Sequence, residues 1–382
     1  MDNPSLESPI DFATATQELE GSAKFVAAKL EQVFREQIAA GLHPGAQLVV
    51  VRQGRVVFDS AAGMANLKRK QPVTHETPFH IFSCTKSFTA VCVHHLEEMG
   101  KLELDAPVQE YWPEFGNKGK GGITVRHALT HQAGLPTQGM PIQVLLWPWP
   151  QLVARYLARL TPAWPPGSRM EYHVVNGSFI LGELIFRASG LRPSAYLQRH
   201  FLQPLGMQHT FTGLPFRYQA GAAYIYNRDP EQRAAASLFN LPIYRSLYIP
   251  AASINTTARD LAVFYQMLCN GGTYAGRHYL KSETIRRATT LAYDGPDGDT
   301  GKHVRWAPGF NLGGYSVFLD QDIRMMGKGS TLETFGHPGQ GGVALAWADP
   351  PSGTVFAFTN NHFQEVVAAH RRFEALSNCV WN

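Results

Sequence analysis

The sequence predicts an α/β domain built from both ends of the chain, with a helical domain inserted between them. Near each end, strand-like segments lie beside a helical pattern, whereas the middle reads as helical pieces broken by proline and glycine. We therefore expect a sheet flanked by helices from residues 22–99 and 281–382, and a helical domain from residues 100–280.

The N-terminal end supplies one helix and one hairpin. Residues 22–40 read as a helix that Ser22 can cap and that Gly41 ends. Residues 46–52 and 55–60 follow as two strands joined by a two-residue turn, as in a β-hairpin. The apolar stripe of the helix comprises Phe25, Val26, Leu30, Val33, Phe34 and Ile38.

The C-terminal end mirrors this arrangement, with strands at residues 342–348 and 354–359 and a helix over about 362–377. The segment 291–301, rich in Gly, Asp and Thr, is expected to be an exposed loop. The clearest helices of the middle region are residues 152–160, 177–188, 193–202 and 257–269.

The composition describes a globular protein of one large or two smaller domains. Of the 382 residues, 44% are hydrophobic and 17% are charged, which suits a sizeable core and excludes a disordered chain. The net charge of +4 is mild and the densest basic run, Lys68-Arg69-Lys70, is short, so nucleic-acid binding is not predicted. The four cysteines are widely spaced without a C-x-x-C pair, which indicates reduced thiols.

Several features argue against a membrane, a leader or a metal. No apolar stretch reaches the roughly 18 residues of a membrane span. Residues 1–20 lack the basic start and apolar run of a secretory leader, so the cytoplasm is the expected location. The nearest approach to a zinc H-E-x-x-H motif, from His75 to His80, is one residue too long and contains a proline. We therefore expect neither a metal nor another cofactor.

Ser83 and Lys86 form the most informative pair in the chain, an S-x-x-K motif at the predicted start of a helix that Gly100 ends. Positions i and i+3 share a helix face, so the hydroxyl and the amine can touch. A hydroxyl is a weak nucleophile until a base takes its proton, and a neutral lysine can be that base. Neutrality near pH 7 requires the pKa of Lys86 to fall by roughly 3 units from ~10.4, which burial and nearby positive charge favour.

The motif alone is weak, because an S-x-x-K is expected about once or twice by chance in a chain of this length. Two further segments strengthen it: residues 171–177, which include Tyr172 and precede a helix, and residues 335–342, which include His337-Pro-Gly and lead into a strand. This ordered set of motifs resembles the serine β-lactamase and penicillin-binding-protein superfamily. Within it, the chain is most similar to class C-like members, including the family VIII esterases.

The resemblance extends from about residue 43 to residue 361 and includes the framework segments 102–108, 123–136 and 204–207. It implies a β-lactamase-like fold, in which an antiparallel sheet flanked by helices carries an inserted helical domain.

The resemblance also implies catalytic roles. Ser83 would be the acylated nucleophile, and Lys86 and Tyr172 would share the proton transfers around it. His337 stands where many relatives carry the lysine of K-T-G, and it would orient Tyr172 or contact a substrate oxygen. Taken alone, Tyr172 is more typical of a buried aromatic residue and His337 of a loop histidine. We expect His43 and His131 to be structural.

The backbone N–H groups of Ser83 and Gln340 would form the oxyanion hole. Gly339, together with the glycines at 341 and 342, fits a strand edge that a substrate approaches closely. Trp147 and Trp149 are equally compatible with the wall of a substrate pocket and with loop anchors of the helical domain.

The second motif bears on the substrate. Class C β-lactamases carry Tyr-x-Asn there, whereas this chain has Val174, which cannot hold a substrate amide through its side chain, and Asn176 lies two residues too late. Tyr172-His173 is more similar to the esterase branch. We therefore expect a serine hydrolase that cleaves small to medium carboxylic esters. The alternatives are a β-lactamase or D-amino-acid peptidase, an acyltransferase and, least favoured, a non-catalytic binder.

Overall fold

A nine-stranded antiparallel sheet forms the centre of the computed structural model, which describes residues 8–13, 19–135, 140–228, 230, 233–318 and 321–381. Pro136, at the end of one framework segment, and parts of the N-terminal 20 residues lie outside the described residues. The strand order is β3-β2-β1-β14-β13-β12-β11-β10-β9, so strands from the two chain ends meet at the β1–β14 pair. The predicted sheet from both ends is therefore confirmed.

The sheet strands are β1 (Gly45–Arg52), β2 (Arg55–Asn66), β3 (Gln71–Pro72), β9 (Tyr293–Pro296), β10 (His303–Ala307), β11 (Phe310–Leu312), β12 (Phe335–Pro338), β13 (Ala344–Asp349) and β14 (Thr354–Asn360). Three two-stranded pairs stand apart, made by β4 (Phe79–His80) with β6 (Asn255–Thr256), β5 (Tyr226–Asn227) with β15 (His362–Phe363), and β7 (Thr273–Tyr274) with β8 (Arg277–His278).

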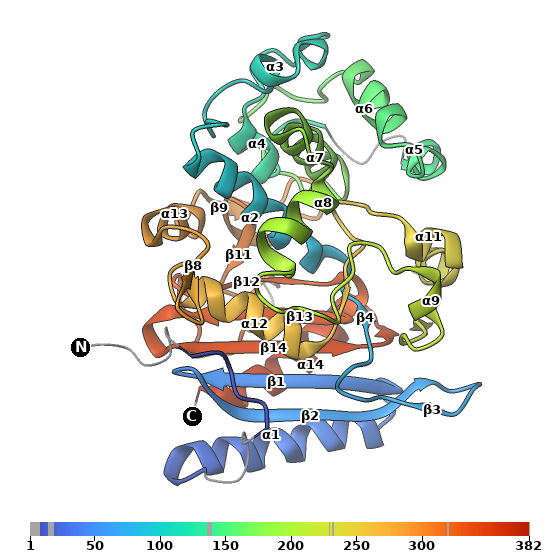
Figure 1. Cartoon of the computed structure of the whole chain (residues 1–382), viewed down its shortest axis with the longest axis vertical. Helices are drawn as coiled ribbons and strands as arrows, with labels where there is room; N and C mark the ends of the chain where they lie inside the picture. The colour runs from blue at the N-terminus through green and yellow to red at the C-terminus, as the bar shows by residue number, and fades with distance from the viewer. Residues whose placement is uncertain are drawn as a thin grey trace.

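The longer helices are α1 (Gly21–Ala39), α2 (Thr85–Glu98), α6 (Pro150–Arg159), α7 (Asn176–Ser189), α10 (Arg233–Asn240), α12 (Ala258–Cys269) and α14 (Val366–Val380). Shorter ones are α3 (Val108–Tyr111), α4 (Val125–Leu129), α5 (Met140–Leu146), α8 (Pro193–Leu197), α9 (Phe216–Gln219), α11 (Pro242–Ser246) and α13 (Ser282–Ala288). Figure 1 shows α3 to α7 gathered at the end of the molecule opposite α1.

Each face of the sheet has its own apolar layer, because side chains alternate along a strand. On β14, Phe356 and Phe358 face the layer formed with α1 and α14, whereas Val355 and Ala357 face α2 and α12. The β13 residues on the α12 side are alanines, and these small side chains let α12 lie close against the sheet. Because α12 falls within residues 100–280, its packing favours a domain division before this helix; the boundary at residue 280 stays a prediction.

Three local expectations are wrong. Ser22 does not cap α1: the helix begins one residue earlier, its N-cap is Glu20, and no side-chain cap is formed. The segment 291–301 is not simply a loop, because β9 within it pairs with β10 as the edge strand of the sheet. The C-terminal helix begins at Val366, since residues 362–363 pair with β5 instead.

The apolar stripe of α1 offers a matched test of core packing. Phe34 is 0% exposed and its ring contacts Phe58, whereas Phe25, predicted to share the stripe, is 63% exposed. We expect Phe34→Ala to lower the free energy of unfolding by about 3–5 kcal/mol through the cavity it leaves. Phe25→Ala should change it by less than about 0.5 kcal/mol. Denaturant unfolding of the two variants measures the difference, and equal losses would contradict the assignment of the buried face.

Candidate active site

Ser83 lies in a short 3₁₀ turn, Phe82–Cys84, between β4 and the first residue of α2. The S-x-x-K motif therefore opens the helix much as predicted, with α2 beginning two residues after the serine. Phe82 has a φ of 45°, a left-handed conformation that is uncommon for a bulky residue. The chain thus turns sharply just before Ser83, whose side chain remains partly exposed while its neighbours Phe82 and Cys84 are buried.

The amine of Lys86 is buried beside the Ser83 hydroxyl, with Nζ 3.2 Å from Oγ. Nζ also lies 2.9 Å from the carbonyl oxygen of Val174 and 3.3 Å from that of Ala251. No carboxylate forms a salt bridge with this amine in the described part of the chain. Burial without a counter-ion lowers the pKa of Lys86 to about 7.

These contacts suit a neutral amine. A carbonyl oxygen can only accept, so the amine must donate one N–H to Val174 and one to Ala251. A neutral amine has only two N–H bonds, and its lone pair then remains for the third direction, toward the Ser83 hydroxyl. The geometry is that of a base next to a nucleophile.

Tyr172 lies next to both Lys86 and Ser83. Its ring centroid is 4.9 Å from Lys86 Nζ, and its hydroxyl hydrogen-bonds with the Ser83 side chain. Desolvation raises the pKa of Tyr172, and the hydrogen bond with Ser83 offsets only part of this rise. The phenol is therefore protonated at neutral pH and able to donate a proton.

His337 is buried on β12 next to this group, with its ring centroid 6.4 Å from that of Tyr172. Its Nδ1 lies 2.7 Å from the carbonyl oxygen of Pro338 and so carries the proton. Its Nε2 has no partner among the described residues. Burial, assisted by nearby Lys86, lowers the pKa of His337 to about 3, so the imidazole is neutral and presents an unused acceptor.

Aromatic and imidazole rings enclose the tyrosine. The Trp306 ring centroid lies 4.6 Å from that of His131 and 5.5 Å from that of His337. His131, expected to be structural, accepts the backbone N–H of His173 through Nδ1 at 3.1 Å, and its ring lies 4.6 Å from that of Tyr172. His173 is itself buried and its Nε2 accepts the backbone N–H of Leu135, which leaves it a positioning role.

Gln340 and Gly339 lie close to the serine turn. A Cβ on Gly339 would lie 2.7 Å from the carbonyl oxygen of Ile81, and the thiol of Cys84 lies 2.8 Å from the carbonyl oxygen of His337. The segment 337–340 thus runs directly past Ser83. Within the described chain, the backbone N–H groups of Ser83 and Gln340 have no internal acceptor, as donors of an oxyanion hole require.

The other two glycines of this segment have a structural role. Gly341 and Gly342 have φ values of 62° and 72°, where other residues are strained. A Cβ on Gly341 would lie 2.6 Å from the Phe363 ring, and one on Gly342 would lie 2.5 Å from Ala369. These contacts require glycine at both positions for packing, and the expectation that a substrate approaches them stays a prediction.

The two predicted tryptophans separate. Trp147 is buried, with its ring centroid 6.1 Å from that of Phe239, which in turn lies 5.0 Å from the ring of Phe82 beside Ser83. Trp149 is exposed at the start of α6. The Phe239 ring therefore lies between Trp147 and Phe82, the neighbour of Ser83, whereas Trp149 lies at the surface.

Asn176 is not a free substitute for the missing carboxamide. It is buried at the start of α7, where its Oδ1 accepts a hydrogen bond from Gln143 at 2.8 Å. A substrate amide would have to displace this contact.

Sequence reasoning missed Trp306 and Asp297. Trp306 stands on β10, where an apolar residue is unremarkable, and Asp297 follows β9 inside the segment that reads as a loop. The carboxylate of Asp297 accepts the backbone N–H of Tyr172 at 2.9 Å. Only the paired Gly and Asp residues around it hint at a structured turn.

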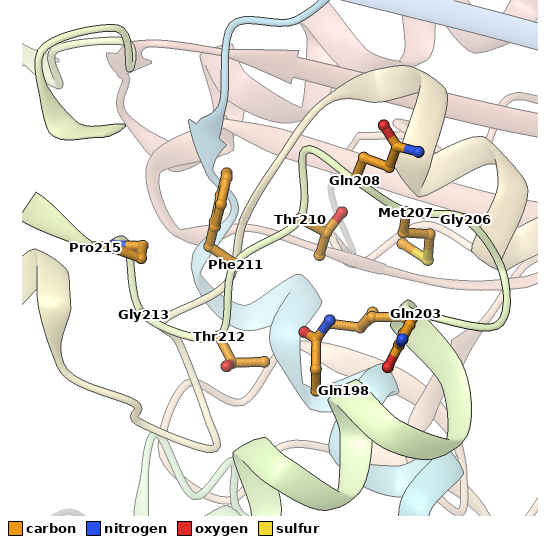
Figure 2. A pocket seen from close by; sticks show the side chains of 11 residues that line it. Gln198, Gln203, Gly206, Met207, Gln208, Thr210, Phe211, Thr212, Gly213 and Pro215 are labelled. Carbon is orange, nitrogen blue, oxygen red and sulfur yellow. The ribbon is translucent and has the colours of Figure 1, made fainter. Parts of the chain in front are cut away.

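The surface also carries a pocket of about 380 Å³ away from these residues (Figure 2). Its lining includes the exposed side chains of Gln198, Gln203 and Gln208, and none of the predicted site residues.

Among the described residues, no group of three or more His, Cys, Asp or Glu side chains is placed to hold a metal. No helix of that part of the chain is long and apolar enough to cross a bilayer.

The β-lactamase family model matches residues 30–378 of this chain. The esterase/β-lactamase LipL of Mycobacterium tuberculosis is 27% identical over 368 residues, which cover 88% of this chain and 82% of LipL. The esterase EstB of Burkholderia gladioli is 30% identical over 203 residues, about half of each chain (49% and 51%).

Solved structures agree. A penicillin-binding-protein homologue from Caulobacter crescentus superposes with a TM-score of 0.79 at 29% identity, covering 95% of this chain and 100% of the other. A family VIII carboxylesterase gives a TM-score of 0.77 at 25% identity with the same coverage. A class C β-lactamase in complex with cefoxitin shares the fold at 18% identity, with a TM-score of 0.69 and coverage of 94% and 99%.

The state of Lys86 can be measured directly. We expect its amine to titrate near pH 7, because the ammonium form loses water without gaining a counter-ion. It is charged below that pH and neutral above it. Lysine-selective NMR of the side-chain carbon next to Nζ follows the titration, and the Lys86→Met variant identifies the signal. A transition above about pH 9 would show that burial does not neutralise this amine.

Proposed function

This chain belongs to the β-lactamase family, and from that premise we propose that it is a serine hydrolase that cleaves small to medium carboxylic esters through an acyl-Ser83 intermediate. The observation that carries this proposal is the buried Lys86 amine, whose Nζ lies 3.2 Å from Ser83 Oγ and 2.9 and 3.3 Å from two backbone carbonyl oxygens. When this amine is neutral, the two carbonyls take its N–H bonds and its lone pair is left for Ser83. The names of the relatives LipL and EstB, and of the family VIII carboxylesterase structure, support an ester substrate.

Acylation follows from the geometry. Lys86 takes the proton of the Ser83 hydroxyl as Oγ forms a bond with the ester carbonyl carbon. The backbone N–H groups of Ser83 and Gln340 stabilise the negative oxygen of the tetrahedral intermediate. When the bond to the alcohol oxygen breaks, Tyr172 passes its proton to that oxygen and recovers one from Lys86, whose Nζ lies over its ring.

Deacylation uses the same groups in reverse. A water molecule gives a proton to the neutral Lys86 amine as its oxygen attacks the acyl carbon. That proton returns to Ser83 Oγ as the carboxylic acid departs. Replacement of that water by an alcohol or amine gives acyl transfer through the same intermediate.

The charge of the site favours neutral substrates. His337 is neutral, and Lys86 loses its charge near pH 7, so no permanent cation stands beside Ser83 where K-T-G relatives place a lysine. Val174 contributes its carbonyl to Lys86 and offers no side-chain amide. A β-lactam carries a carboxylate, whereas a simple ester needs only the oxyanion donors and an apolar surround.

β-Lactam hydrolysis is the second candidate. The β-lactamase of Escherichia coli is 30% identical over 230 residues, which cover 58% of this chain and 56% of that protein. The scaffold and the Ser83–Lys86–Tyr172 group suit either acyl donor, and the difference lies in what holds the remainder of the substrate.

Loss of the nucleophile tests the mechanism. We expect Ser83→Ala to lower kcat/KM for p-nitrophenyl esters, from acetate to laurate, by at least about 10³-fold. Ser282→Ala, which changes a serine at the start of α13, should keep wild-type activity. Stopped-flow burst kinetics should show acyl-enzyme accumulation in the wild type only. Full activity in the folded Ser83→Ala variant would exclude the acyl-serine route, and strong turnover of a chromogenic cephalosporin by the wild type would favour the second candidate.

The charge argument has its own test. We expect His337→Lys to raise kcat/KM for an anionic cephalosporin relative to a neutral ester by about 10-fold or more, because a cation would meet the substrate carboxylate. His337→Gln, which adds no charge, should leave that ratio within about 3-fold. If His337→Gln changed the ratio as strongly as the lysine variant, shape rather than charge would determine the preference.

A further inference from the structure

The turn between β9 and β10 contacts the segment that carries Tyr172. Oδ2 of Asp297 accepts the backbone N–H of Tyr172 at 2.9 Å. Oδ1 accepts the backbone N–H groups of Asp299 and Thr300 at 3.1 and 2.9 Å, and the Thr300 hydroxyl at 3.0 Å. Four donors thus converge on a carboxylate whose residue is 4% exposed.

Neighbouring contacts join the same two segments. The backbone N–H of Gly298 donates to the carbonyl of Met170 at 2.9 Å, and the Arg169 guanidinium donates to the carbonyl of Gly298. Arg169 also pairs with Glu171 at 2.7 Å. Residues 169–173 form no helix or strand of their own, so the position of Tyr172 depends on such contacts from elsewhere in the chain.

The charge of Asp297 acts on the tyrosine as well. Within the described residues, no salt bridge involves the Asp297 carboxylate. Desolvation and the Cys84 thiol are the larger causes that raise the pKa of Tyr172, and the Asp297 carboxylate adds to them. The titratable side chains that face the Tyr172 ring include Lys86 from α2, His131 after α4 and His337 from β12.

We propose that Asp297 is the positioning residue of Tyr172, which it holds where the phenol meets Ser83 and the oxygen of the leaving alcohol. The inference rests on the proposed function, in which the Tyr172 O–H bond breaks, its proton moves to the departing alkoxide oxygen, and Lys86 returns a proton to the phenolate. Asp297 itself exchanges no proton. Its loss should therefore matter most for substrates whose leaving group needs that proton.

The experiment compares two esters of one acid, ethyl butyrate and p-nitrophenyl butyrate. p-Nitrophenolate departs without protonation, whereas ethoxide does not. Asp297→Asn keeps the size of the side chain but replaces an acceptor oxygen by a donor, so at least one N–H loses its partner. We expect kcat for the ethyl ester to fall about 10²-fold with KM within about 3-fold, and kcat for the p-nitrophenyl ester to fall about 10-fold or less.

The controls separate positioning from folding. Asp299→Asn changes an exposed carboxylate on the same turn and should keep wild-type kinetics with both esters. Asp297→Glu keeps the charge but displaces it, and should show a smaller loss with the same substrate bias; it supplies the test if the asparagine variant does not fold. In a Tyr172→Phe background, Asp297→Asn should add little further loss.

Equal losses with the two esters, or additive losses in the double variant, would overturn the positioning role while leaving the hydrolase proposal intact. Failure of the hydrolase proposal has a different signature, because Ser83→Ala would then keep its activity.

Discussion

The site depends on keeping one amine out of water. Lowering the pKa of Lys86 from 10.5 to about 7 requires the fold to supply on the order of 5 kcal/mol against the ammonium form. That work is done by packing, because the two carbonyls that receive the amine come from segments far apart in the sequence, one before α7 and one after α11. The segments that carry Lys86, Val174 and Ala251 must therefore be packed together before the amine loses its charge near pH 7.

The tautomers of two histidines near Tyr172 are fixed by backbone contacts. In His337 and in His173, Nδ1 lies against a nearby backbone carbonyl, which fixes the proton there and leaves Nε2 as an acceptor. His173 uses that acceptor within the protein, whereas His337 does not. Two histidines with the same Nδ1 contact thus differ at Nε2, which accepts the backbone N–H of Leu135 in His173 and has no partner among the described residues in His337. Above about pH 7, neither His337 nor Lys86 carries a charge.

Spacing alone predicted the features that are local in the chain. Ser83 and Lys86 meet because they are three positions apart at a helix start, and the β-hairpin near the N-terminus follows from two valine-rich runs on either side of Gln53-Gly54. The failures are tertiary in origin. Segment 291–301 is polar enough to read as a loop and becomes partly strand only by pairing with β10. Asp297 is buried against a segment more than a hundred residues away in the sequence. Phe25 belongs to the apolar stripe of α1 but remains exposed, because the packing of α1 against the rest of the protein decides which part of the stripe is buried.

The β1–β14 pairing has a consequence for how the protein is made. Strand β1 needs β14 along its whole length, from Ala46 with Asn360 to Arg52 with Thr354. At ordinary synthesis rates, β14 leaves the ribosome roughly 15–60 s after β1. During that interval β1 has an unpaired edge and uncovered apolar side chains, which invite pairing with other chains. Newly made copies would thus pass through a period of vulnerability in which yield depends on crowding and chaperone supply, even though the finished sheet leaves β1 at its interior.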